Sequence, residues 1–456
     1  MSVGAFMAFL DAPVVSIAFP DIARTFEQTS TTSTAWVLNA YFIAFAACLV
    51  IAGKLADRFG RRRVFLGGLT LFGAASALCG AAPSLDVLIA ARALQGLAAA
   101  LVVPAGQGLM LAAFPAGERK VAIGALAAVV GLATAASPSV GGAIVELSSW
   151  RWIFYVNVFV GLGAIAWGTR LLDRDEPDAN AALPDFAGAL LQAVAVGFVV
   201  LGLLKQHDWG LGDERTLACF AIFAVALPLF LWRCARHPAP VLDLSLFRDR
   251  GIAVANAASV LFAVGFYAVT ITCVLFFTLV WGYSTIETGL ALTPGALAGM
   301  VAGGIAGRVT ERRGPRGVAM LGGAMAAIGL VLIISMTGQR PDFVGDWLLG
   351  GLVYTAGAVT ALTALIGAAV TTVEPERFAV VSGVNAAVRQ VGGAVGVAAV
   401  VGLVGTPTLS NALDRTHDAF AVAAVALVAA VVVSVLLPAS AAGPTRAVGE
   451  PAAERA

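Results

Sequence analysis

Two ionisable side chains in apolar surroundings are the first candidates for chemistry in this sequence. Asp11 is the only charged residue in FLDAPVVSIAFP (9–20), and Arg92 opens RALQGLAAALVVPA (92–105), three positions before Gln95. Burial favours the neutral form of a carboxyl group, whereas a nearby cation favours the carboxylate. These opposing effects suit a group that takes up and releases protons. We therefore expect Asp11 to be a proton-coupling acid with Arg92 as its partner.

No enzymatic or metal-binding pattern accompanies this pair. The three histidines are far apart in the sequence, and the five cysteines lie singly in apolar runs without metal-ligand spacing. No GxxxxGKS or GxxxxGKT phosphate-binding loop occurs, which argues against direct use of ATP. We predict that the protein is not an enzyme and that it holds no metal or cofactor.

The composition places the candidate residues in a membrane. Hydrophobic residues make up 59% of the 456 residues, charged residues only 12%, and the net charge is +1. Soluble domains carry about 25% charged residues, and a soluble chain of this size could not bury so much apolar surface. We expect a multi-pass protein in contact with membrane lipid, and no nucleic-acid partner.

Long apolar runs define the elements that must position Asp11 and Arg92. Each run is long enough for a helix that crosses about 30 Å of hydrocarbon. We predict an all-α integral membrane fold with fourteen transmembrane helices, over residues 1–22, 34–53, 64–82, 87–112, 121–146, 152–171, 186–205, 216–235, 252–281, 286–307, 317–337, 346–371, 379–404 and 417–438. Lysine and arginine concentrate in alternate loops, so the positive-inside rule places both termini in the cytoplasm.

An internal repeat divides the chain. GKLADRFGRR (53–62) and GRVTERRGPR (307–316) share an acid, three bases and two glycines in register. Two parallel six-helix halves with an inserted helix pair between them explain this repeat. The predicted parts are 1–171 for the N-terminal half, 172–250 for the inserted pair and its linkers, 251–438 for the C-terminal half and 439–456 for a cytoplasmic tail.

Several stretches resemble motifs of one known family. GKLADRFGRRRVF resembles the loop 2–3 signature of the major facilitator superfamily. FLDAPVVSIAFPDI, RALQGLAAALVVPA and VVGLATAASPSVGGAI resemble the motifs of spans 1, 4 and 5 in its fourteen-helix drug:proton antiporter branch. SSWRWIFYVNVFVG and VSGVNAAVRQVGGAVG resemble stretches at spans 6 and 13 of that branch.

The resemblance implies a function. It implies a secondary active transporter of the bacterial inner membrane that exports small hydrophobic or amphipathic compounds, such as drugs and antibiotics, in exchange for protons. It also implies a monomeric functional unit. Two alternatives are an importer or uniporter with the same fold and a membrane sensor or scaffold that transports nothing. A third, a membrane enzyme, is the least favoured, because the sequence lacks a reactive group of residues.

The loop signature implies a conformational latch on the cytoplasmic side, where this loop braces the two halves of the family's members. The residues that carry it are Gly53, Asp57, Arg58, Gly60, Arg61, Glu311 and Arg312. The alternative is a solvated surface ion pair, which contributes about 0–1 kcal/mol.

The span 5 motif implies an exporter and predicts a close helix contact. Pro138 lacks an N–H and is expected to bend or break its helix. Gly131, Gly141 and Gly142 would let a helix of the other half approach closely. Ordinary packing of small residues is the alternative.

Polar and aromatic residues in the spans are candidates for a substrate cavity. We expect its lining to include Tyr41, Gln95, Phe154, Asn157, Tyr267, Asn385, Arg389 and Gln390. A charge deep in the membrane usually faces a cavity and has a partner. Two alternatives stay open: Asp11 only holds its span to that of Arg92, or Arg389 only satisfies carbonyl groups beside the glycines that follow it.

The topology can be tested by labelling. We expect Arg63→Cys, in a background without native cysteines, to react in intact cells with a membrane-permeant maleimide but not with an impermeant one. Arg340→Cys, in an expected outer loop, is the control and should react with both. Labelling of position 63 by the impermeant reagent would overturn the orientation.

Overall fold

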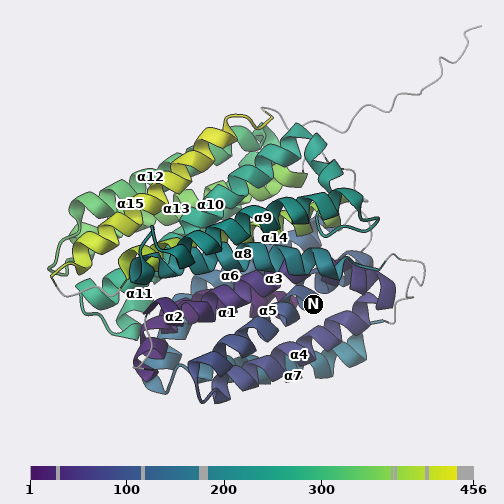
Figure 1. The fold of residues 1–456 in the computed structure, drawn as a ribbon, viewed down its shortest axis with the longest axis horizontal. Helices are drawn as coiled ribbons and strands as arrows, with labels where there is room; N and C mark the ends of the chain where they lie inside the picture. Colours follow the sequence, from purple (N-terminus) through teal and green to yellow (C-terminus); the bar gives the residue numbers. More distant parts are fainter. Residues whose placement is uncertain are drawn as a thin grey trace, which may run out of the picture.

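Long helices run side by side through the computed structural model (Figure 1). The structure describes residues 2–26, 31–114, 119–173, 183–370, 373, 377–405 and 410–438, with the backbone alone at positions 2, 31, 111, 119–128, 130, 131, 134, 135 and 379. Every regular element within these ranges is helical. The predicted cytoplasmic tail at 439–456 and much of the linker that precedes the inserted pair lie outside the described residues.

The helices follow the predicted order of spans. The long ones are α1 (Ser2–Thr25), α3 (Trp36–Phe59), α4 (Arg61–Ala81), α5 (Leu85–Ala113), α6 (Arg119–Leu147), α7 (Trp152–Leu171), α8 (Phe186–Trp209), α9 (Glu214–Arg236), α10 (Arg250–Leu275), α11 (Thr285–Arg313), α12 (Pro315–Met336), α13 (Leu348–Val370), α14 (Phe378–Val404) and α15 (Ala412–Ser434). The short ones are α2 (Thr31–Thr34), η1 (Leu244–Arg248), and the π-helical turns η2 (Phe276–Val280) and η3 (Phe343–Trp347).

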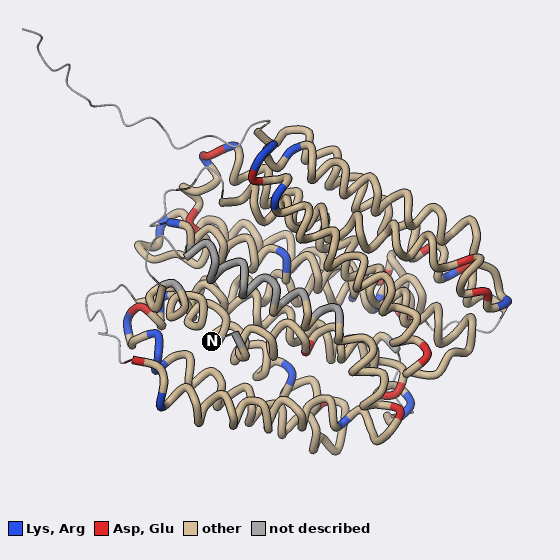
Figure 2. Tube along the Cα trace, turned by 180° about the vertical axis from the view of Figure 1, so that it is seen from behind, with Lys and Arg blue, Asp and Glu red and all other residues tan. Residues whose placement is uncertain are grey.

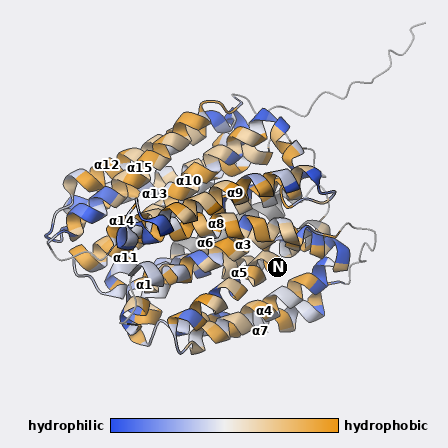
Figure 3. Cartoon of the chain, viewed as in Figure 1, coloured by the Kyte–Doolittle hydropathy of each residue, from blue (hydrophilic) through white to orange (hydrophobic). Residues whose placement is uncertain are grey.

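Thirteen helices in the described part of the chain are long and apolar enough to cross a membrane. α6 occupies the expected fifth span but is not among the thirteen, and most of its side chains up to residue 135 are outside the description. The count of fourteen spans therefore stays a prediction. Hydrophobic residues cover the length of the helices (Figure 3), and charged residues gather toward the helix ends (Figure 2).

The repeated motif forms a helix-to-helix joint rather than the loop that its composition suggests. α3 continues through Asp57 and ends at Phe59, and α4 begins at Arg61, so Gly60 alone separates the two helices. The second copy repeats this arrangement at Gly314, between α11 and α12. Gly60 has φ 94° and Gly314 has φ 82°, a region that favours glycine. The helix thus extends past residue 53, where the second span is expected to end, because charged residues continue it beyond the apolar run.

Helix packing is duplicated along the chain. In the first seven helices, α1 packs on α6, α3 on α5, and α4 on α5 and α7. In the last six, α10 packs on α14, α11 on α13, and α12 on α13 and α15, which is the same set of pairs. The two sets meet along α6 and α11 and along α3 and α14, and these two seams are also equivalent.

α8 and α9 lie across one of these seams (Figure 1), and α8 packs on both α14 and α3. A Cβ at Gly402 of α14 would overlap the carbonyl oxygen of Leu203 in α8, so the two backbones touch there. Thr32 donates a hydrogen bond to Asp208 of α8 at 3.1 Å. In the segment that follows α9 in the chain, the carbonyl oxygen of Pro240 accepts a hydrogen bond from Lys54 of α3 at 2.7 Å. The helix pair is therefore fastened to both sets.

A partly buried ion pair holds α8 to α9. Asp185 accepts from Arg233 Nε at 2.7 Å and from the backbone N–H of Gly188, which caps the N-terminus of α8. Burial raises the pKa of Asp185, but the hydrogen bonds from Gly188 and Arg233 outweigh it, so this pKa lies below its usual value. The carboxylate thus stays charged and keeps the pair joined at neutral pH.

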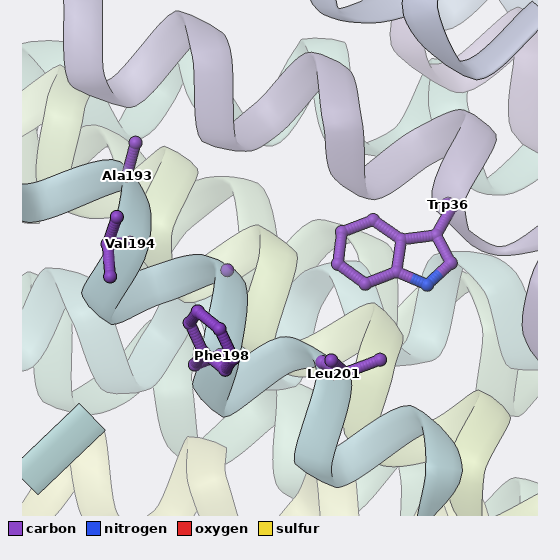
Figure 4. A pocket seen from close by; sticks show the side chains of 6 residues that line it. Trp36, Ala193, Val194, Phe198 and Leu201 are labelled. Atoms are coloured by element: carbon purple, nitrogen blue, oxygen red, sulfur yellow. The ribbon is translucent and has the colours of Figure 1, made fainter. Parts of the chain in front are cut away.

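An apolar groove opens between α3 and α8 (Figure 4). Its volume is about 330 Å³, and its lining residues are Trp36, Ala193, Val194, Gly197, Phe198 and Leu201. Further along α3, Ala47 and Ile51 belong to a buried cluster with Ala189 and Phe230 of the helix pair. α8 therefore contacts the C-terminal half of α3 closely and diverges from α3 toward Trp36.

Glycine allows α12 and α13 to pack with their backbones in contact. A Cβ at Gly357 would overlap the backbone nitrogen of Ala326, whereas Gly304 of α11 has no atom within 4 Å of a Cβ. We expect Gly357→Ala to lower the melting temperature of the purified protein, because overpacking costs about 1–3 kcal/mol. Gly304→Ala is the matched control and should leave the melting temperature unchanged or raise it, since Ala favours helix by about 1 kcal/mol. Equal effects of the two changes would contradict the close packing.

Candidate functional site

Asp11 lies at the centre of a buried polar network in the first set of helices. Its carboxylate pairs with Arg92 of α5 and accepts hydrogen bonds from Gln95 of α5 at 2.9 Å and Asn157 of α7 at 3.2 Å. The Asp11 side chain is 1% exposed and that of Arg92 is 0% exposed. The structure thus brings together the predicted acid, its predicted cation and two polar residues expected at a cavity.

Arg92 is held from three helices. Its Nε donates to the carbonyl oxygen of Val37 in α3 at 3.0 Å, and Nη1 donates to Gln95 at 2.5 Å. The guanidinium lies 4.5 Å from the ring centre of Tyr41, a cation–π arrangement. Nη2 is buried without a hydrogen-bond partner among the described residues. The cation is thus fixed in place, while the two N–H groups of Nη2 make no hydrogen bond to the described residues.

Gln95 connects the ion pair to α4. Its amide nitrogen donates to Ser76 at 2.9 Å as well as to Asp11, and its oxygen accepts weakly from Cys79. Gln95 and Ser76 are both fully buried. Sequence reasoning missed Val37, Ser76 and Cys79. Ser76 and Cys79 are three positions apart in a helix, so they share a face, but this spacing is common in apolar spans and carries little signal.

The four cavity candidates of the first set all surround this network. Tyr41 is 1% exposed and donates its hydroxyl hydrogen to the carbonyl oxygen of Ala8 at 3.1 Å. Phe154 is 0% exposed and lies beside the Arg92 guanidinium at 5.7 Å. With Gln95 and Asn157 also buried, these side chains hold the ion pair in a dry environment in this conformation.

The candidates in the last set form a second cluster on α14 and α10. Asn385 accepts a hydrogen bond from Arg389 and donates to Asn256 at 3.2 Å and to Ser259 at 3.0 Å. The buried oxygen of Gln390 has no hydrogen-bond partner among the described residues.

The structure does not support the alternative that Arg389 satisfies carbonyl groups. Its hydrogen bond within the described chain goes to the Asn385 side chain. The backbone of α10 packs directly against Gly392 and Gly396, which follow Arg389 on α14. A Cβ at Gly392 would lie 2.6 Å from the carbonyl oxygen of Val260. Close packing of α14 on α10 is therefore the role of these glycines.

The first copy of the repeated motif, at residues 53–62, contains a local ion pair. Asp57 pairs with Arg61 at 3.0 Å across the glycine joint, and their side chains are 57% and 41% exposed. Arg61 also donates to the carbonyl oxygen of Gly108 at 3.4 Å, which ties the joint to α5. Gly53 faces Pro104 of α5, and Gly60 is the joint itself. Among the other predicted residues, Arg58 is half-buried, and Glu311 and Arg312 are exposed.

The span 5 motif lies on a seam between the two sets. A Cβ at Gly142 would lie 2.7 Å from the carbonyl oxygen of Thr285 in α11, and Gly289 of α11 meets the carbonyl oxygen of Pro138. Gly141 instead faces Val14 of α1. α6 runs through Pro138 without a break, so the helix is not interrupted there. The surroundings of Gly131 lie outside the described residues.

Hydrogen bonds join the same seam. Thr285 donates to Asp21, near the C-terminal end of α1, at 2.6 Å, and Ser139 of α6 bonds Thr293 of α11. The sequence analysis missed these four residues. Asp21 follows Pro20 at the end of the first apolar run, a position that looks like an ordinary polar boundary in the sequence.

No cluster of three or more histidine, cysteine or acidic residues with the geometry of a metal site occurs among the residues that the structure describes. The five cysteines are free.

Comparison with known proteins finds one matching family model and several similar sequences. The model described as Major Facilitator Superfamily matches residues 1–397. The chain is 35% identical over 414 residues to the multidrug resistance protein Stp of Mycobacterium tuberculosis, covering 90% of this chain and 76% of that protein. It is 33% identical over 400 residues to the tetracenomycin C resistance and export protein of Streptomyces glaucescens, covering 87% and 73%. It is 31% identical over 423 residues to the methylenomycin A resistance protein of Streptomyces coelicolor, covering 92% and 86%.

Solved structures share the fold. A bacterial homologue of the human lysosomal transporter Spinster, in an inward-facing and unoccupied conformation, aligns with a TM-score of 0.66 at 15% identity. The alignment covers 95% of each chain. A structure of a proton-dependent oligopeptide transporter aligns with a TM-score of 0.64 at 14% identity, covering 95% of this chain and 96% of that one.

The ion pair can be tested by a double-mutant cycle. Removing one partner of a buried pair costs about 3–5 kcal/mol, because the other charge is left uncompensated. We expect Asp11→Asn and Arg92→Met each to lower the melting temperature, and the double variant to lower it less than Asp11→Asn alone. Additive losses in the double variant, measured by thermal unfolding in detergent, would show that the two side chains do not interact.

Proposed function

This chain belongs to the Major Facilitator Superfamily, and we propose that it exports small hydrophobic or amphipathic compounds, drugs and antibiotics among them, in exchange for protons. It is a multi-pass membrane transporter and not an enzyme. The relatives named above are resistance and export proteins, which favours export as the direction. The observation that carries the proposal is the buried pair of Asp11 and Arg92.

The proposed coupling step is protonation of Asp11. A proton on this carboxyl group removes the negative charge that balances Arg92, while Arg92 keeps its contacts with Val37, Gln95 and Tyr41. α1 would then be held less strongly to α5. Because α1 also packs on α6 and reaches α11 through Asp21, a shift of α1 bears on the seam between the two sets. Protonation and substrate binding would alternate, which gives antiport.

We place the chain in the fourteen-helix branch, with two six-helix halves and an inserted pair at α8 and α9. The helical backbone of α6 at the fifth expected span and the duplicated packing support this division. We propose a bacterial inner membrane location with cytoplasmic termini. In that orientation, the contacts of Pro138 and Gly142 with α11 close the outer side of the protein.

The cytoplasmic motif is proposed as a latch that holds the cytoplasmic side closed when the outer side is open. Asp57 and Arg61 are paired with each other within the motif, and Arg61 also reaches α5. A partly exposed pair contributes little to stability, so it can exchange partners at small cost when the halves move. Glu311 and Arg312 of the second copy are exposed and belong to the same proposed latch.

A drug-susceptibility panel in an efflux-deficient bacterial host tests the function. We expect the wild-type protein to raise the inhibitory concentration of several hydrophobic compounds, and Asp11→Asn to abolish the increase because it cannot cycle a proton. Glu146→Gln, which removes an exposed acid at the end of α6, is the matched control and should behave as the wild type. Uptake driven inward together with protons would favour an importer instead.

Stability and coupling can be separated. The double variant Asp11→Asn with Arg92→Met should regain folded protein relative to Asp11→Asn, yet remain inactive in efflux. Activity is compared per amount of folded transporter in proteoliposomes under an imposed pH difference. If Asp11→Asn still concentrates substrate against a gradient there, Asp11 is not the coupling acid.

A further inference from the structure

Arg389 is a cation inside a membrane-spanning helix. It lies on α14, within the span Val380–Val404. A charged side chain at such a depth costs at least about 2.5–3.5 kcal/mol unless a partner or a polar cavity compensates it. The first set of helices compensates Arg92 with Asp11. Asp11 belongs to the first set, so a different group has to offset the cost of burying the Arg389 charge.

The neighbours of Arg389 are polar but uncharged. Its Nη1 donates to Asn385, which in turn is held by its hydrogen bonds to Asn256 and Ser259 of α10. These three residues are between 0% and 2% exposed. A neutral hydrogen-bonded ladder therefore positions the guanidinium, and none of these three residues balances its charge.

The guanidinium keeps most of its donors for another partner. Within the described chain, neither an acidic side chain nor a backbone carbonyl accepts a hydrogen bond from Arg389. A guanidinium offers five N–H groups in a planar fork that matches a carboxylate or sulfonate. The Arg389 side chain is half-buried rather than fully enclosed, so space adjoins it.

Aromatic rings lie beside the turn of α14 that follows Arg389. A Cβ at Gly393, one turn after Arg389, would lie 2.8 Å from the ring of Tyr267. The Tyr267 ring centre lies 5.5 Å from that of Phe266 and 4.9 Å from that of Phe42 on α3. Tyr267 and Phe266 are half-buried. The two sets of helices thus present an aromatic cluster close to a cation that has no acidic partner among the described residues.

We propose that Arg389 binds the acidic group of the transported compound and that the Tyr267 surface holds its aromatic body. This inference rests on the proposed export function and narrows its substrate class to amphipathic aromatic acids. The substrate itself then supplies the counter-charge that no described residue supplies at this position. In this arrangement Arg389 binds the anionic group of the substrate, and Asp11 binds the proton.

A pair of probes that differ by one acidic group tests the site. 1-Anilinonaphthalene-8-sulfonate is an anion, and N-phenyl-1-naphthylamine is its neutral counterpart. Binding of each is measured by fluorescence to the purified full-length protein in nanodiscs, with empty nanodiscs subtracted. We expect the wild type to bind the sulfonate more tightly. Arg389→Gln should weaken sulfonate binding about tenfold or more, because a charge-assisted hydrogen bond contributes about 1.5–3 kcal/mol.

Controls separate a binding role from a structural one. Neutral-probe binding should stay within about twofold of the wild type in Arg389→Gln, since hydrophobic contacts do not depend on the cation. Arg389→Lys should keep part of the preference, because it retains the charge but loses the planar fork. Arg340→Gln, which removes an exposed arginine elsewhere in the same set, should change neither probe.

Two results would overturn the inference. One is equal weakening of both probes in Arg389→Gln, and the other is no preference for the sulfonate in the wild type. Efflux of both probes under a pH difference is measured in parallel. Efflux of the neutral probe without a sulfonate preference would refute only the Arg389 site. Efflux of neither probe would refute the proposed export, and the binding comparison would still decide the role of Arg389.

Discussion

The attraction between Asp11 and Arg92 is the interaction on which this structure depends most. Each charge alone would be costly in a membrane interior, and each is paired with the other where both side chains are fully buried. Four helices contribute to that space: α1, α3, α5 and α7 all supply groups that contact the pair. The polar network therefore fixes the relative positions of helices whose remaining contacts are largely apolar and nondirectional.

Close backbone contact positions the helices at their interfaces, as the buried ion pair does at the centre of the first set. Without a hydrophobic driving force between helices in lipid, small residues supply close van der Waals packing. The same helix pairs recur in both sets, and the seam of α6 with α11 corresponds to that of α3 with α14. Only the second of these seams is overlaid by α8 in the described structure. The two equivalent seams thus differ, because α8 and α9 cover only one of them in the described structure.

The sequence carried the main features for physical reasons that are easy to state. A lone acid in an apolar run needs a partner, and Arg92 was a strong candidate, so this pair could be predicted. The surrounding shell could not, because Ser76 and Val37 contribute a hydroxyl and a backbone carbonyl that any span can offer. The joint at Gly60 was mistaken for a loop, since charges mark the end of the hydrocarbon but not the end of a helix. The hydrogen bond of Asp21 with Thr285 joins residues far apart in the chain, which local patterns do not encode.

The way α8 is mounted has a mechanical consequence. Its contact with α14 at Gly402 is backbone on backbone and therefore stiff, whereas its separation from α3 beside Trp36 is a groove that side chains leave unfilled. Deformation concentrates where an assembly is softest. Rotation of one set of helices against the other would thus change the groove's volume before it strains the Gly402 contact. Acyl chains that occupied this groove would have to leave it as its volume falls, and the lateral pressure of a bilayer would then act on the protein at this point.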